Sequence, residues 1–220
     1  MPHTPTATIE RLVHLVQLAA TALSRVSKAA LDAEGSRAEQ ELAAAESVLV
    51  PLHEEIEDGA SVLLAGRGPV PEDLREVVAD AHVGGDVQQL TDLARRVGEI
   101  AWARRSRGPF PDPVRQPLRG MSSLAVEMVA KAGGALQQAA PETIADLHGG
   151  LNEIGQRQRL LYGQLLAAEP PFDRVDVVDA VLLGCCFECC AGHALSVARH
   201  AVLFTARPWA LSGQRSSGRR

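Results

Sequence analysis

The sequence is poor in aromatic residues. Only 3% of its 220 residues are Phe, Trp or Tyr, whereas 46% are hydrophobic, mostly Ala, Leu and Val. A β-sandwich depends on β-branched and aromatic side chains, so this composition argues against one. Small apolar residues instead favour closely packed helices, and the chain is long enough for one compact domain or two small ones.

The chain also lacks an excess of positive charge. Its formal net charge is -5, whereas a nucleic-acid-binding protein needs a basic surface to neutralise phosphates. The first ten residues do not combine a basic region with an apolar core, so we expect no signal peptide. Even the most apolar segment contains Asp176, Asp179 and Glu188, and no run of about twenty residues is free of charge. These absences predict a cytoplasmic protein with no nucleic-acid partner and no membrane-inserted helix.

Cysteine is absent from the chain except in one segment. All four cysteines lie in the sequence CCFECC, from Cys185 to Cys190. A disulfide framework spreads cysteines along the chain to close loops, which this cluster does not do. The distribution therefore favours a reducing compartment.

Six segments carry the apolar periodicity of amphipathic helices. They cover residues 8–34, 39–64, 73–107, 114–140, 141–168 and 173–207. Thr8 is predicted to cap the first helix, and Pro51 to kink the second because its ring clashes with the carbonyl group four residues earlier. Asp73 suits the positive N-terminal end of the third helix, and Arg104 and Arg107 suit its C-terminal end.

The third and sixth helical segments repeat one pattern about a hundred residues apart. In the third, spacings of four and three residues place these apolar side chains on one face: Val83, Val87, Leu90, Ala94, Val97 and Ala101. In the sixth, the equivalent face carries Leu183, Phe187, Cys190, Ala194, Val197 and Ala201, continued by Phe204. The same period turns Gln88 and Asp92 toward solvent, and Glu188 and Gly192 take the equivalent positions. The chain therefore contains a doubled helical unit.

A proline-rich segment separates the two units. The sequence GPFPDP, residues 108–113, holds three prolines, which do not continue a helix. We therefore predict an all-α fold of two tandem three-helix bundles related by an internal repeat. Residues 1–108 form the first bundle, 109–113 the linker and 114–207 the second bundle. Residues 208–220 are small, polar and basic, which is typical of a disordered tail.

Two longer motifs, one in each half, are the most specific features of the chain. The first consists of Asp73-Leu74-Arg75 after a Pro-Val turn, followed by Asp86 and Asp92 in an acidic segment. The second consists of Leu182-Leu183-Gly184, Glu188, His193-Ala194 and Ala198-Arg199. Together they resemble the motifs of the PhoU family of phosphate-uptake regulators, in particular an actinobacterial branch. The resemblance covers nearly the whole chain.

The resemblance implies a regulator and not an enzyme. PhoU-like proteins are paired three-helix bundles that associate with a phosphate-specific ABC transporter and a sensor histidine kinase, and they hold off the phosphate-starvation response when phosphate is plentiful. We therefore expect a cytoplasmic adaptor that contacts the transporter ATPase and the kinase, and we also expect a homodimer. The start of the third helix, at Asp73 and Arg75, keeps the family pattern and is the candidate partner surface.

Many members of this family bind iron or zinc clusters through a Glu or Asp followed four residues later by Asp. Two carboxylates with this spacing lie one helical turn apart and can bridge a cation. Here both pairs are incomplete, because Gln88 precedes Asp92 and Gly192 follows Glu188. Asp92 and Glu188 remain as metal candidates in a degenerate motif. Single carboxylates on solvated faces are ordinary surface charges, and we therefore expect no cofactor. An intact motif would bind iron or zinc.

The cysteine cluster supports an alternative function. By helical periodicity Cys186 and Cys190 face the core, whereas Cys185 and Cys189 point outward beside Glu188. Two exposed thiols and a carboxylate can hold a metal ion, or the thiols can form a redox pair if their pKa is lowered. Four thiols on two helix faces do not converge on one ion. This favours the interpretation that the cysteines arose by sequence drift at a site without function. Three hypotheses stay open: a PhoU-like adaptor, a metal- or thiol-sensing protein on the same scaffold, and a degenerate paralogue that dimerises with an intact relative.

The histidines suggest no site. His193 lies at the edge of the apolar face, and we expect it to pack there with a hydrogen bond. The other histidines have no spacing that indicates a set of ligands: His14, His82, His148 and His200.

Overall fold

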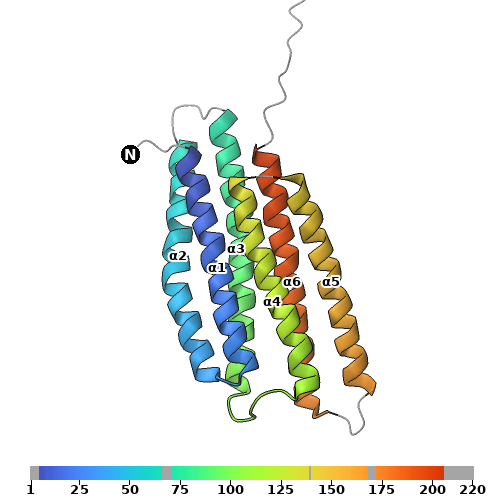
Figure 1. The fold of residues 1–220 in the computed structure, drawn as a ribbon. Helices are drawn as coiled ribbons and strands as arrows, with labels where there is room; N and C mark the ends of the chain where they lie inside the picture. Colours follow the sequence, from blue (N-terminus) through green and yellow to red (C-terminus); the bar gives the residue numbers. More distant parts are fainter. Residues whose placement is uncertain (1–4, 66–70, 139, 168–171, 206–220) are drawn as a thin grey trace, which may run out of the picture.

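The protein, described here by a computed structural model, consists of long helices. The structure describes residues 5–65, 71–138, 140–167 and 172–205, and over these ranges it contains no strand. The helices are α1 (Pro5–Leu31), α2 (Gly35–Ala65), α3 (Pro71–Ala103), α4 (Asp112–Gln137), α5 (Pro141–Ala167) and α6 (Arg174–Thr205). The predicted all-α fold of two three-helix bundles is confirmed, with α1 to α3 in one bundle and α4 to α6 in the other (Figure 1).

Four helices join the two bundles. α1 packs against α4 and α3 packs against α6, so these four helices form the middle of the molecule. α2 covers α1 and α3 on one side, and α5 covers α4 and α6 on the other, as the outer positions of α2 and α5 in Figure 1 show. One hydrophobic core extends through both bundles, from Leu12 of α1 to Leu161 of α5. The division into separate domains at residues 109–113 stays a prediction.

The apolar faces predicted for α3 and α6 lie at the centre of this core. Each of their twelve side chains from Val83 to Ala101 and from Leu183 to Ala201 is at most 2% exposed. Phe204, predicted to continue the second face, has a side chain outside the described part. Alanine and valine at most of these positions let the helices approach closely, because the distance between packed helices depends on the side chains at their contact.

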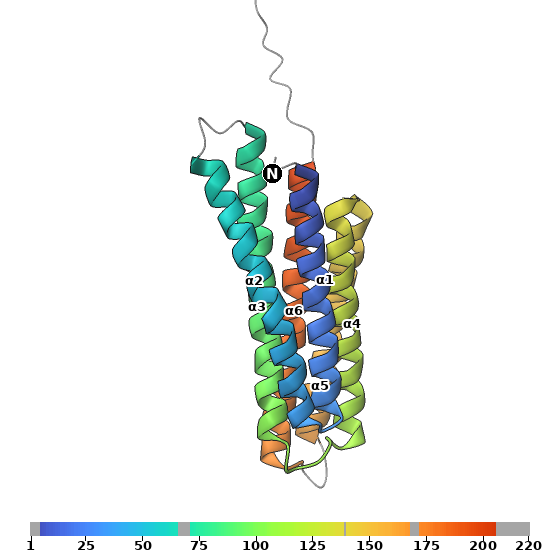
Figure 2. The same cartoon turned by 90° about the vertical axis from the view of Figure 1, so that its left-hand side faces the viewer.

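Several helix ends differ from the prediction. α1 begins at Pro5, so Thr8 lies inside the helix and is not its N-cap. Proline suits the first turn of a helix, because it lacks an N–H group that would have no partner there. α3 ends at Ala103, before the predicted residue 107. Pro51 lies inside α2, which diverges from α1 toward its C-terminal end (Figure 2), and the kink at Pro51 stays a prediction.

The proline-rich segment between the bundles is packed against the protein. Phe110 is 2% exposed, and the guanidinium carbon of Arg104 lies 3.6 Å from the centre of its ring. Gly108 has a φ of 74°, a conformation that glycine adopts without a steric penalty. α4 already begins at Asp112, so Pro113 belongs to its first turn and not to the linker.

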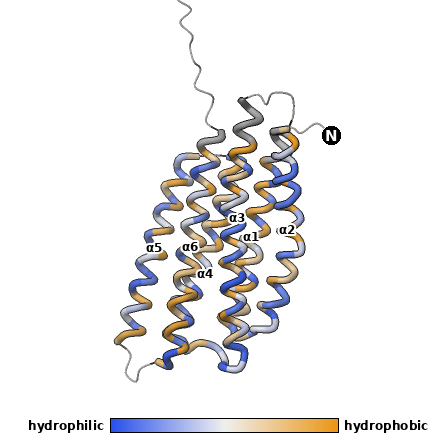
Figure 3. The backbone as a smooth tube through the Cα atoms, turned by 180° about the vertical axis from the view of Figure 1, so that it is seen from behind, coloured by the Kyte–Doolittle hydropathy of each residue, from blue (hydrophilic) through white to orange (hydrophobic). Residues whose placement is uncertain are grey.

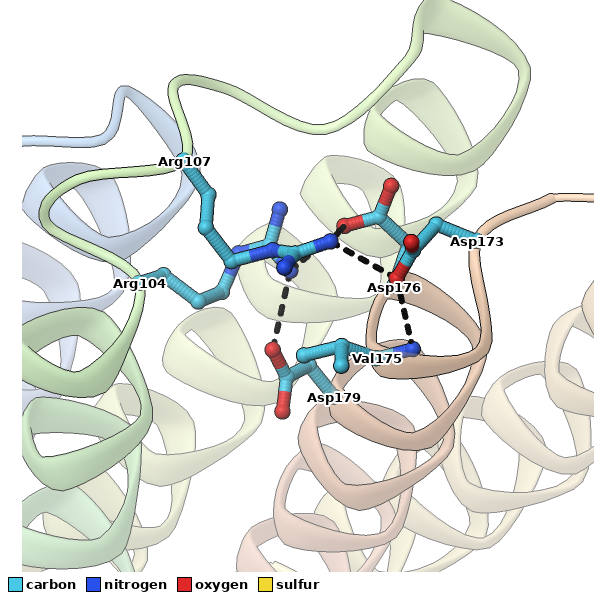
Figure 4. Close-up of polar contacts among 6 residues, drawn as sticks. All are labelled: Arg104, Arg107, Asp173, Val175, Asp176 and Asp179. Carbon is cyan, nitrogen blue, oxygen red and sulfur yellow. Dashed lines mark hydrogen bonds and ion pairs between the residues drawn. The ribbon is translucent and has the colours of Figure 1, made fainter.

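Arg104 connects the two bundles through charge. Its side chain is almost fully buried, and Nη1 donates hydrogen bonds to Asp176 Oδ1 at 2.7 Å and Asp179 Oδ2 at 2.8 Å on α6 (Figure 4). Nearby, Arg107 Nη2 donates to Asp173 Oδ1 at 2.7 Å, and the same carboxylate accepts the backbone N–H of Val175 at the start of α6. The role predicted for Arg104, a charge at the end of α3, is therefore incomplete, because this residue neutralises two carboxylates of the other bundle.

α6 is the most apolar of the helices, with hydrophobic residues along much of its length (Figure 3). Its stretch Arg174–Val202 is long and apolar enough to cross a membrane by length and composition, so the charges counted in the sequence do not exclude a spanning helix by themselves. More than half of that stretch is buried in the structure, where α6 packs against α3, α4 and α5. A core helix of a bundle has this composition too, and the packing accounts for it.

Truncating the buried faces should destabilise the protein strongly. We expect Phe187→Ala and Leu90→Ala to lower the free energy of unfolding by about 2–5 kcal/mol, because each removes a buried side chain and leaves a cavity. Leu166→Ala is the matched control, since Leu166 is 86% exposed, and it should change stability by less than about 0.5 kcal/mol. Urea unfolding followed by circular dichroism measures all three variants. Equal losses would contradict the assignment of the faces.

Removing Arg104 should also be costly. Arg104→Ala leaves Asp176 and Asp179 without their buried counter-charge, and we expect a loss of about 3–5 kcal/mol. Arg107→Ala, which removes a more exposed ion pair, should cost about 0–1 kcal/mol. Adding Asp176→Asn and Asp179→Asn to Arg104→Ala should recover part of the loss, because no uncompensated charge then remains. If urea unfolding shows no recovery, packing on Phe110 and not charge explains the role of Arg104.

Candidate functional site

The residues singled out as site candidates from the sequence fall into two groups in the structure. Asp92 of α3 and Cys189 of α6 line one cleft of about 470 Å³ between these helices. Arg95, Arg96 and His193 also line this cleft. Cys185 and Glu188 lie elsewhere, on the side of α6 that faces α5. The four candidates therefore do not meet at one place.

The second group is in contact with α5. Cys185 Sγ lies 3.4 Å from the hydroxyl oxygen of Tyr162 and 3.7 Å from Nε2 of Gln158. Glu188 lies beside Gly155, where an added Cβ atom would be 3.7 Å from Glu188 Oε1. Burial, together with the neighbouring Cys185, raises the pKa of Tyr162, so the phenol stays protonated. These contacts make Cys185 and Glu188 part of the packing between α5 and α6.

Asp92 differs from the lone surface charge that the sequence predicts. Arg95 Nη1 lies 2.6 Å from Asp92 Oδ1, and the same guanidinium donates through Nε and Nη2 to Glu46 of α2, at 2.9 and 2.8 Å. Gln88 Nε2 lies 3.5 Å from the same Asp92 oxygen. The pKa of Arg95 is raised, first by its hydrogen bond to Glu46 and then by charge attraction to Glu46 and Asp92. A metal ion at Asp92 would therefore compete with a guanidinium that is already in place.

Three of the four thiols have a raised pKa. Cys186 and Cys190 are buried and Cys185 and Cys189 exposed, as the helical period predicts. Burial is the first cause that raises the pKa of Cys186 to about 11, and it also raises the pKa of Cys190 and of Cys189. The neighbouring Cys185 and Glu188 raise the pKa of Cys189 further. Because the thiolate is the form that binds metals and reacts with oxidants, the raised pKa of Cys189 argues against a thiol sensor at this residue.

A cluster of imidazoles around Asp86 joins α3 to α6. His193 Nδ1 lies 2.9 Å from Asp86 Oδ1, and His200 Nδ1 lies 3.4 Å from Asp86 Oδ2. The ring of His82 stacks on that of His200, with 4.5 Å between their centres. The prediction that His193 packs with a hydrogen bond is confirmed, and His82 and His200, whose spacing suggests no site, lie beside the same aspartate.

The sequence contains a signal for this cluster, but it becomes visible only when α3 is paired with α6. His82 and Asp86 are four residues apart and lie on one face of α3, and His193 and His200 are seven apart on one face of α6. Each pair alone is common in a helix. The two pairs indicate a cluster only when α3 is known to pack against α6.

No family model matches the chain, but curated proteins do. It is 31% identical over 193 residues to the phosphate-specific transport system accessory protein PhoU homolog 2 of Mycobacterium tuberculosis, covering 88% of this chain and 90% of that protein. The chain belongs to the PhoU family. It is also 29% identical over 193 residues to PhoU homolog 1 of Mycobacterium leprae, covering 88% of this chain and 86% of that protein.

Solved structures of the PhoU family have the same fold. The crystal structure of PhoU from Pseudomonas aeruginosa matches with a TM-score of 0.79 at 17% identity, over 90% of this chain and 95% of that one. The PhoU structure from Streptococcus pneumoniae matches with a TM-score of 0.75 at 14% identity, over 92% and 95%. At this level of identity the likeness concerns the fold alone.

The metal motif of the PhoU family does not fit the residues present here. Gln88 and Gly192 stand one turn from Asp92 and Glu188, so neither carboxylate faces a second one across a helical turn. Asp92 is bound by Arg95 instead, and Glu188 lies against α5. Within the described ranges, no group of three or more His, Cys, Asp or Glu residues is arranged to hold a metal ion. The side chains of Asp73 and Arg75, the predicted partner surface in the first turn of α3, lie outside the described residues.

Cys189 should react slowly with thiol reagents. In a Cys185→Ser variant Cys189 is the one exposed thiol, because Cys186 and Cys190 are buried. Its raised pKa lowers the thiolate fraction near neutral pH, so alkylation by iodoacetamide should accelerate only as the pH passes above the ordinary thiol pKa of about 8.5. The same variant unfolded in urea is the control. A midpoint of the rate profile below the unfolded value would restore the thiol-sensing alternative.

Proposed function

We propose that the protein is a regulatory accessory protein of a phosphate-specific transport system. The observation that carries this proposal is the 31% identity to an accessory protein of such a system, which extends over 88% of the chain and thus over both bundles. The fold that the chain shares with solved PhoU structures is in keeping with this proposal. Regulation of phosphate uptake, and not catalysis, is the role that follows.

In this proposal the protein acts in the cytoplasm by contact with the ATPase of the phosphate transporter and with a sensor histidine kinase. It holds off the phosphate-starvation response while phosphate is plentiful.

We further propose that this regulator works without a metal cluster. Arg95 supplies the positive charge beside Asp92 and Glu46, and Glu188 has its place in the contact with α5. The scaffold therefore keeps its shape without a bound cation at either motif. Metal analysis of the purified protein tests this point directly, and stoichiometric iron or zinc that is lost in Asp92→Ala would contradict it.

Arg75 provides a test of the partner surface. Neither capping nor core packing requires an arginine at the start of α3, so Arg75→Glu should leave the melting temperature unchanged. It should weaken binding to the transporter ATPase or the sensor kinase, and raise the expression of phosphate-starvation genes at high phosphate. Lys131→Glu is the matched charge reversal on the exposed face of α4, and it should do neither.

Two results separate the parts of this proposal. A folded Arg75→Glu protein that binds and represses normally places the interface elsewhere on the molecule. Deletion of the gene, alone and together with any paralogue, tests the function itself. If starvation-gene expression at high phosphate is unchanged in both deletions, the regulatory assignment fails.

A further inference from the structure

A second, larger cleft lies between α1 and α4, the helices that open the two bundles. Its volume is about 690 Å³, and its polar lining consists of Ser24 and Lys28 of α1, Asp32 just after α1, and Arg119, Ser122 and Ser123 of α4. α1 and α4 lie side by side, and the cleft lies toward the end where α1 leads into α2, at the bottom of Figure 1. It is separate from the cleft between α3 and α6.

The charged groups of this cleft are arranged to leave a cation free. Arg119 Nη2 donates to Asp32 Oδ1 at 2.6 Å, which holds the guanidinium across the cleft while its other N–H groups keep their donor capacity. Among the described residues, the side chain of Lys28 makes no ion pair and no hydrogen bond. The sequence has one other lysine, Lys131, and that residue pairs with Glu127 at 3.0 Å. The lining therefore carries two cations against one carboxylate.

Ser122 adds a hydroxyl that has no partner among the described side chains. It is 7% exposed, lines the cleft, and makes no side-chain hydrogen bond with any described residue. Hydroxyls in helices commonly bond to a carbonyl group of the preceding turn, as Thr21, Ser47 and Thr91 do in this protein. Ser122 is thus a donor that a molecule in the cleft can satisfy.

We propose that this cleft binds a small organic phosphomonoester. Lys28, Arg119 and Ser122 supply three donors, which match the three acceptor oxygens of a phosphate group better than the two of a carboxylate. Leu31 and Val126, the apolar residues of the lining, provide a surface for the carbon part of the ligand. The volume also points to an organic molecule, since pockets for such ligands measure about 300–1,000 Å³.

This inference goes beyond the proposed function, which requires only contacts with other proteins. The cleft is formed by one helix of each bundle, so a ligand held by Lys28 of α1 and Ser122 of α4 is bound by both halves at once. A soluble metabolite would in this way stabilise the arrangement of the two bundles in which it is bound.

Isothermal titration calorimetry on the full chain tests the proposal with three probes: glycerol 3-phosphate, glucose 6-phosphate and adenosine 5′-monophosphate. At least one should bind with a Kd of about 1 mM or tighter. Glycerol, glucose and adenosine, which lack the phosphate, should not bind measurably. Inorganic phosphate and citrate should bind at least about tenfold more weakly than the best probe, because they lack the organic body or the phosphate group.

Substitutions locate the binding. Lys28→Ala and Ser122→Ala should each weaken the best probe by at least about fivefold, because each removes one donor to the phosphate. Lys131→Ala removes the other lysine and should leave the affinity unchanged. Melting temperatures show whether each variant is folded, and Lys28→Ala is the decisive variant because Lys28 is exposed.

Four results would overturn the proposal. They are no binding by any of the three probes, equal binding of inorganic phosphate, equal binding of citrate, and wild-type affinity in folded Lys28→Ala. Equal binding of inorganic phosphate would show an anion site without an organic ligand. Equal binding of citrate would show a site that does not select phosphate.

Discussion

The contact between α3 and α6 holds the two halves of the protein in one arrangement. Each helix buries an apolar face built mainly from alanine, valine and leucine, and these small side chains fill the core only if the helices approach closely. Apolar faces alone do not fix the register of two long helices. Two polar contacts do so at different heights: Arg104 binds Asp176 and Asp179 near one end, and Asp86 binds His193 further along. A shift by one helical turn would break both.

The fold was predictable from the sequence because buried helices leave a strong periodic pattern. Phe187 and Leu90 repeat at helical spacing with their neighbours, and the repeat in the second half indicates a second bundle. The contacts between helices were not predictable in the same way. Arg104 lies 72 residues from Asp176, and His82 meets His200 only after α3 is placed against α6. Periodicity describes one helix at a time, so it shows which face is buried and not what that face meets.

The candidate site shows how the PhoU scaffold tolerates changes at its surface. Gln88 and Gly192 stand where the family motif has carboxylates, and the remaining Asp92 is held by Arg95 instead. In the proposed regulator a guanidinium thus neutralises Asp92, as a bound cation would in a relative with the intact motif. In the core, by contrast, Cys186 and Cys190 act as small apolar residues with raised pKa values.

The buried position of Arg104 has a consequence for how the chain is made. Its partner Asp176 is 72 residues further along, and a ribosome adds about 5–20 residues per second, so Arg104 emerges on the order of 4–14 seconds before its first counter-charge. During that interval the first bundle has an apolar face on α3 that α6 does not yet cover, beside a cation without a partner. Nascent chains of this protein therefore pass through a state that exposes both apolar and charged surface to chaperones. This surface is covered only when α6 has been synthesised and packs against α3.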